Sequence, residues 1–128
     1  MKILAVSDRV LDKLYSGQIR HTYADVDLLV GCGDLPFYYL DFLTSAIDAP
    51  LVYVRGNHDG GTQYAADGRT WTSVRGGVDI HGKVVTRKGF IIAGLQGSMR
   101  YKAHGDYMYT EAEMRRAIAQ LVPRLLWN

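Results

Sequence analysis

The first 55 residues alternate short apolar runs with segments of helical periodicity. The apolar runs cover residues 2–6, 28–30 and 51–54, and strands buried on both faces have this composition. Residues 9–20 carry apolar side chains at near-helical spacing, and Pro36 suits the first position of a second helix. This βαβαβ order predicts an α/β fold with a parallel sheet and right-handed crossovers.

Polar side chains follow the C-terminal end of each predicted strand. They are Ser7, Asp8, Asp34, Asn57, His58 and Asp59. Ligands of open α/β sheets bind at this edge, and oxygen donors beside an imidazole suit Mn²⁺, Fe²⁺ or Zn²⁺. The alternative is structural, with Asp8 and Asp34 as helix N-caps and His58 as a turn residue.

Three short motifs in these segments resemble the signature motifs of a known family. Ser7-Asp8, Gly33-Asp34 and the Gly-Asn-His-Asp sequence at 56–59 resemble the first three motifs of the calcineurin-like metallophosphoesterases. The resemblance covers residues 1–60 and continues more loosely to the last predicted helix. It implies a metallophosphoesterase-type β-sandwich flanked by helices. Residues 1–128 would form a single domain, the N-terminal portion of the family fold, incomplete at its C-terminus.

The same resemblance implies a reaction and a set of roles. The chain would hydrolyse a phosphate mono- or diester with a metal-bound hydroxide, as metallophosphoesterases do. Asp8 would ligate a first metal, Asp34 would bridge two metals, and Asn57 would ligate the second. His58 would be the catalytic residue that faces the substrate, and Asp59 would orient the loop. The implied cofactor is a divalent metal, Mn²⁺ first and Fe or Zn otherwise, dinuclear in the intact family site.

Two departures from the family pattern support a competing hypothesis. Val10 stands where the first motif has a histidine ligand, and valine cannot bind a metal. Only His81 and His104 follow His58, and neither lies in the family's later histidine motifs. The alternative is therefore a non-catalytic, degenerate phosphoesterase-like domain that binds metal weakly or serves as a scaffold. A nucleotide-binding Rossmann-like module is disfavoured, because Pro36 replaces the third glycine of its fingerprint.

The rest of the chain predicts a loop, a hairpin and a helix. Residues 60–77 read as a long functional loop, and residues 83–87 and 90–95 as a hairpin turning at Lys88-Gly89. Thr110 and Glu113 form a capping box for the last helix, which Pro123 is expected to end or kink.

Composition excludes several classes of protein. The chain has 15 basic and 13 acidic residues, a balance that gives no clear nucleic-acid or membrane signal. It has no apolar run long enough to span a membrane and no signal-peptide core, so we expect a cytoplasmic location. The expected partner is a phosphate-ester substrate that the sequence does not identify. A truncated domain would also expose apolar surface and self-associate.

Overall fold

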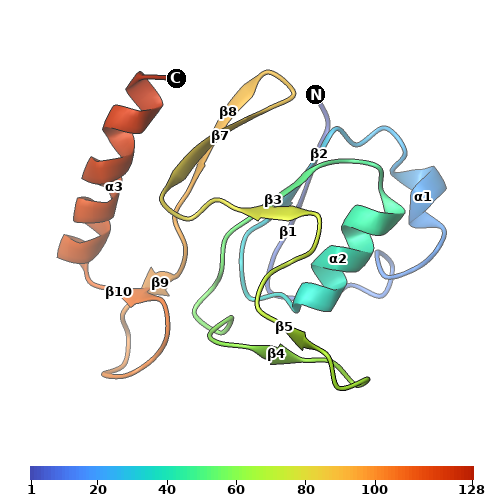
Figure 1. The fold of residues 1–128 in the computed structure, drawn as a ribbon, viewed down its shortest axis with the longest axis horizontal. Coiled ribbons are helices and arrows are strands. Elements are labelled where there is room, and N and C mark those ends of the chain that lie inside the picture. Colours follow the sequence, from blue (N-terminus) through green and yellow to red (C-terminus); the bar gives the residue numbers. More distant parts are fainter.

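The computed structural model describes residues 1–128 and contains one four-stranded parallel sheet (Figure 1). Its strands lie in the order β1 (Ile3–Val6), β2 (Leu28–Gly31), β3 (Leu51–Tyr53) and β6 (Gly77–Asp79). The α/β class, the three predicted strands with their parallel pairing and the helix after the second strand are confirmed. Sequence inspection missed β6, because Gly77 and Asp79 leave it without an apolar run.

The segment predicted as a helix over residues 9–20 is mostly turns. Only α1 (Ile19–Thr22) is helical, and the residues before it form successive turns such as the Tyr15 N–H to Leu11 carbonyl bond. Gly17 interrupts the segment, and Gln18 gives α1 no side-chain cap. The apolar side chains of this segment still pack into the core, where Leu14 and Ile19 are both buried.

Helix α2 (Phe37–Ala46) agrees with its prediction to within one residue. Pro36 is its N-cap in an extended conformation rather than its first helical residue. The Phe37 N–H donates to the Gln63 side chain at 2.7 Å, so a distant residue satisfies one of the free N–H groups at this helix end. Gln63 belongs to the hairpin of β4 (Gln63–Tyr64) and β5 (Thr70–Trp71), which lies inside the predicted long loop.

The main core lies between the sheet and the helices. Its fully buried members include Leu29, Leu51 and Tyr53 from the sheet and Tyr39 and Leu43 from α2. A smaller cluster of Leu28, Val52 and Ile80 packs with partly buried side chains of the next hairpin. Strands β2 and β3 therefore contribute side chains to two separate apolar clusters, as their continuous apolar runs predict. The edge strand β1 was predicted to be buried in the same way, but only its Val6 is buried, because nothing pairs with its outer edge.

The C-terminal elements form two further pairs of strands and a helix. The predicted hairpin is confirmed as β7 (Lys83–Arg87) and β8 (Phe90–Gly94), with Lys88 and Gly89 both at positive φ, as a type I′ turn requires. Two short parallel strands follow, β9 (Ser98–Met99) and β10 (Met108–Tyr109). Together with β4–β5, these make three two-stranded sheets beside the four-stranded one.

Helix α3 (Glu111–Leu126) starts with the predicted capping box between Thr110 and Glu113. It does not end at Pro123 and runs to Leu126, because a proline near a helix end removes only one of the last hydrogen bonds. It packs against β7 (Figure 1), and Leu121 is its one buried residue. None of the helices combines the length and apolar composition needed to cross a membrane.

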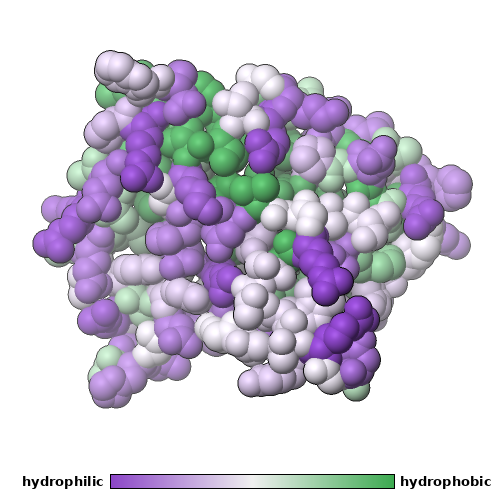
Figure 2. All heavy atoms as spheres, in the orientation of Figure 1, coloured by the Kyte–Doolittle hydropathy of each residue, from purple (hydrophilic) through white to green (hydrophobic).

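Apolar side chains are exposed on several elements. Figure 2 shows them gathered beside the β7–β8 hairpin in the upper part of the view. Ile3, Phe90 and Ile91 are each about half exposed, and Trp127 is almost fully exposed. The expected exposure of apolar surface is thus present, while self-association stays a prediction.

Candidate functional site

Three of the parallel strands end level with one another. Val6 pairs with Gly31, and Gly31 pairs with Tyr53. The segments that leave these strands stay in contact, since the Asp8 N–H donates to the Gly33 carbonyl at 3.2 Å. The structure therefore brings the three predicted polar segments to one edge of the sheet, where α/β folds bind ligands.

Asp8 and Asp34 share an unusual backbone conformation. Their φ angles are 63° and 57°, in the left-handed region that residues other than glycine seldom adopt. Such strain clusters at functional sites, where the surroundings hold it in place. Two successive strands thus each end in an aspartate that is held in a disfavoured conformation.

The Asp34 carboxylate contacts the Gly-Asn-His-Asp loop. Its Oδ1 atom accepts the His58 N–H at 2.8 Å and lies 3.4 Å from His58 Nδ1. Gly56 makes this approach possible, because a Cβ at that position would collide with the Asp34 side chain. The His58 ring is 69% exposed and Asp34 is 22% exposed, so the pair faces solvent from a partly buried base.

Asp59 fixes this arrangement from the protein interior. Its carboxylate is buried, and its Oδ2 atom accepts the N–H groups of Asp34 and Gly56 at 2.6 and 2.7 Å. Burial raises the pKa of the Asp59 carboxyl above its ordinary value, against the opposing effect of these two hydrogen bonds. The geometry is that of a residue that orients the loop.

Asn57 is oriented by a residue outside the predicted set of metal ligands and catalytic residues. Its Nδ2 donates to the Tyr101 hydroxyl at 3.0 Å and lies 3.4 Å from His58 Nε2. With the amide nitrogen engaged, the amide oxygen is the atom left for a cation. No spacing rule could have found Tyr101, which lies 44 positions further along the chain.

Asp8 is near the site through its backbone only. Its side chain is exposed and makes no hydrogen bond or ion pair with Asp34, Asn57 or His58. Val10 packs against the core, so it does not enter the site at all. No three Asp, Glu, His or Cys side chains lie close enough together to hold a metal ion. Asp34 and Asn57 supply carboxylate and amide oxygens, the ligand types that hard divalent ions prefer.

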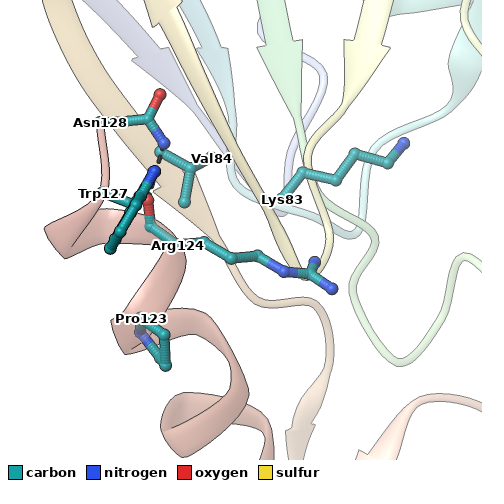
Figure 3. Close-up of a pocket in the computed structure, with 6 residues that line it drawn as sticks. All are labelled: Lys83, Val84, Pro123, Arg124, Trp127 and Asn128. Carbon is teal, nitrogen blue, oxygen red and sulfur yellow. Dashed lines mark hydrogen bonds between the residues drawn. The ribbon is translucent and has the colours of Figure 1, made fainter.

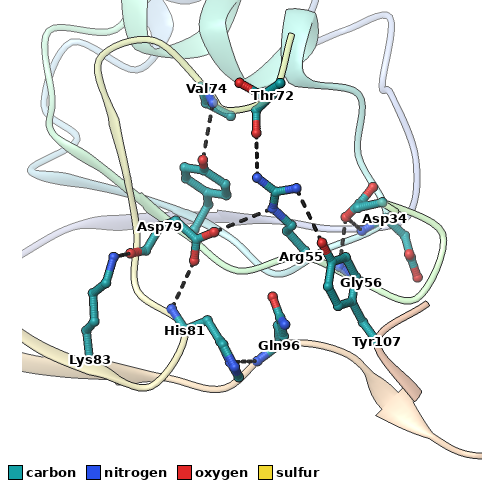
Figure 4. Close-up of polar contacts among 12 residues, drawn as sticks. Asp34, Arg55, Gly56, Thr72, Val74, Asp79, His81, Lys83, Gln96 and Tyr107 are labelled. Carbon is teal, nitrogen blue, oxygen red and sulfur yellow. Dashed lines mark hydrogen bonds and ion pairs between the residues drawn. The ribbon is translucent and has the colours of Figure 1, made fainter. Parts of the chain in front are cut away.

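Arg55, which directly precedes the Gly-Asn-His-Asp loop, has a structural role (Figure 4). Its guanidinium donates to the Thr72 carbonyl at 2.5 Å, lies 3.5 Å from Asp79 Oδ2 and covers the Phe37 ring. Asp79 in turn accepts the His81 N–H. These contacts tie β3 to β6 and leave Arg55 only slightly exposed, so it supports the loop rather than offering a charge to a ligand.

His81 and His104 do not join the site. His81 Nδ1 accepts the Gln96 N–H at 3.1 Å, and its ring stacks on Tyr109. His104 is exposed in the segment between β9 and β10. His58 is therefore the one histidine that the structure places beside the Asp34 carboxylate.

The largest cavity lies elsewhere, between β7 and the end of α3 (Figure 3). Its volume is about 580 Å³, and it is lined by Lys83, Val84, Pro123, Arg124, Trp127 and Asn128. It holds no carboxylate, histidine or hydroxyl that could perform chemistry. The candidate site is instead the open surface around Asp34 and His58.

Comparison with known proteins identifies no relative. No family model matches the chain, and no curated protein or solved structure matches it significantly.

Proposed function

We propose that this chain is a metal-dependent phosphoesterase that hydrolyses a phosphate mono- or diester. One observation carries the proposal. Asp34 Oδ1 lies 2.8 Å from the His58 backbone nitrogen and 3.4 Å from His58 Nδ1, at the edge of a parallel sheet where α/β folds bind ligands. The metallophosphoesterase fold is part of the same proposal.

Each residue has a role in the proposed site. Asp34 and the Asn57 amide oxygen would hold the divalent ion, Mn²⁺ in the first instance, and Asp8 would join them as a further ligand. A bound ion supplies a hydroxide nucleophile at neutral pH and offsets charge on the phosphoryl oxygens. The dinuclear arrangement stays a prediction, because its further ligands are not gathered.

The exposure of His58 supports a role in acting on the substrate. Its side chain is 69% exposed, and its Nδ1 is oriented by the Asp34 carboxylate at 3.4 Å. An imidazole in that position can donate a proton to the leaving oxygen of a phosphate ester. It would therefore serve as a general acid, not as a ligand.

The location proposed for this activity is the cytoplasm. Cys32 is an exposed free thiol, and such thiols persist in reducing compartments. A redox-sensitive labelling of Cys32 in intact cells would test this location.

The test is hydrolysis of bis(p-nitrophenyl) phosphate with and without Mn²⁺. We expect Mn²⁺-dependent turnover that falls in His58→Ala, by up to about 10²–10⁴-fold for alkyl phosphate esters, whose leaving oxygen needs the proton that a general acid supplies. Metal binding should persist in that variant, as measured by equilibrium dialysis. His21→Ala removes an exposed histidine of α1, away from the site, and is the matched control. Equal loss in both variants would contradict the assignment of His58.

A non-catalytic domain is the second candidate, and one observation favours it. Val10 packs into the core where the family has a histidine ligand, and three acidic or histidine side chains are not gathered around one point. Under this candidate, dialysis detects weak Mn²⁺ binding while hydrolysis is absent at every metal concentration. Turnover that depends on His58 would exclude it.

A further inference from the structure

The segment between β9 and β10 lies against the Gly-Asn-His-Asp loop. The Gly97 N–H donates to the Arg55 carbonyl at 2.7 Å, just before the segment begins. The Tyr101 hydroxyl then meets Asn57, and Asp106 packs so closely on Gly60 that a Cβ there would collide with its carboxylate. Residues 100–107 therefore form a wall beside the candidate site.

Tyr101 is the aromatic side chain of this wall that is both anchored and exposed. Its hydroxyl is fixed by the Asn57 amide at 3.0 Å, yet 62% of the residue remains exposed. Tyr107 and Tyr109, in contrast, are half-buried and bonded to Arg55 and Gln96. The Lys102 ammonium lies over one face of this ring, and the rest of the side chain is exposed to solvent.

The charge next to this ring points to an anionic planar ligand. Lys102 Nζ lies 5.7 Å from the centroid of the Tyr101 ring and forms no ion pair within the chain. A phosphate bound at Asn57 and His58 would be next to Tyr101, whose hydroxyl contacts the Asn57 amide. The group esterified to that phosphate would then meet the tyrosine ring.

We propose that Tyr101 determines specificity by stacking on a planar ring carried by the phosphate ester, such as the base of a nucleotide. This inference rests on the proposed function for the position of the phosphate. Stacking of one base on an aromatic side chain changes affinity by about fivefold to about 150-fold. The proposal therefore predicts a preference for a nucleotide over the corresponding sugar phosphate.

The experiment compares AMP with ribose 5-phosphate, each as its non-hydrolysable phosphonate analogue, by titration calorimetry in the presence of Mn²⁺. We expect the wild-type chain to bind AMP at least about fivefold more tightly. Tyr101→Phe keeps the ring and should keep the preference, whereas Tyr101→Leu should bind both compounds equally. Tyr64→Leu is the matched control, since Tyr64 is 82% exposed and lies in β4, outside the wall. Thermal melts check that each variant is folded.

Three outcomes overturn the proposal: equal binding of the two compounds by the wild type, a preference that survives in Tyr101→Leu, or binding of neither compound. Its failure is distinguishable from failure of the proposed function. If the chain prefers AMP through Tyr101 but hydrolyses no ester, the proposed hydrolase activity is wrong and the stacking role of Tyr101 stands. If the chain hydrolyses esters but shows no such preference, the stacking role is wrong and the hydrolase activity stands.

Discussion

The Asp34 N–H donates to Asp59 Oδ2 at 2.6 Å, from a residue whose φ is 57°. The same oxygen accepts the Gly56 N–H, so one buried carboxylate fixes the ends of two strand-end segments. Asp34 Oδ1 then accepts the His58 N–H. Asp59 therefore holds the candidate site together without facing a ligand.

Removing the Asp59 carboxylate should destabilise the chain. Asp59→Ala leaves two N–H groups of Asp34 and Gly56 without their acceptor, which is expected to lower the free energy of unfolding by about 2–4 kcal/mol. Asp59→Asn keeps one acceptor oxygen and should lose less than about 1 kcal/mol. Urea unfolding measures both. Asp12→Ala, which removes an exposed aspartate in the turns before α1, is the control, and an equal loss there would contradict the role of Asp59.

The stability contribution of Asp59 should depend on pH with a definite sign. Because burial raises its pKa in the folded state above 3.8, the folded chain keeps a proton that the unfolded chain has lost. The free energy of unfolding should therefore fall as the pH rises from 3.8 through the raised pKa, and the effect should level off above it. Asp25, Asp67 and Glu113 have lowered pKa values, so their contributions to the free energy of unfolding increase as the pH rises.

The comparison of wild type with Asp59→Asn isolates this contribution. Urea unfolding of both proteins across the acidic range gives the difference in stability at each pH. The wild type should lose stability relative to the variant as the pH rises. A relative gain would mean that the two hydrogen bonds outweigh burial.

The close contact between Gly56 and the Asp34 side chain allows a second test of the site geometry. Gly56→Ala would push a methyl group into the Asp34 side chain, and overpacking of this kind lowers stability by about 1–3 kcal/mol. Gly17→Ala meets no atom within 4 Å and should change stability by less than about 0.5 kcal/mol. Thermal unfolding compares the two. If Gly56→Ala were as stable as Gly17→Ala, Asp34 would not lie where the structure places it.

The capping box predicts the behaviour of α3. The Thr110 side chain accepts the Glu113 N–H at 3.2 Å, and the Thr110 N–H donates back to Glu113 at 2.7 Å, which lowers the pKa of that carboxyl. Thr110→Ala should lower the free energy of unfolding by about 1 kcal/mol. Circular dichroism during urea unfolding measures it. Thr62→Ala, in an exposed loop, should have no measurable effect.

Sequence reasoning predicted the strand-end positions because periodicity and strand order are local properties. Asp34, Asn57 and His58 needed only the βαβαβ pattern to be brought together. The predicted helix over residues 9–20 was wrong, because apolar spacing does not reveal whether Gly17 and an uncapped start permit a helix. Nor could local patterns find the Asn57–Tyr101 bond, which joins residues 44 positions apart.

Asp8 shows the limit of motif reasoning in the site itself. Its backbone lies where the motif predicts, next to Gly33, while its exposed carboxylate contacts none of the other proposed ligands. Side-chain direction depends on neighbours that are distant in sequence. Its metal role therefore stays a prediction.

The most direct test of the proposed function is the Mn²⁺-dependent hydrolysis rate of bis(p-nitrophenyl) phosphate in Asp34→Asn. This substitution keeps the shape of the side chain and removes the charge that would hold the ion. The exposed Asp12, in the turns before α1, provides the control Asp12→Asn. We predict that the wild type and Asp12→Asn hydrolyse the ester only with Mn²⁺, and that Asp34→Asn loses this activity. Activity that is unchanged in Asp34→Asn, or absent from the wild type at every Mn²⁺ concentration, would contradict the proposed function.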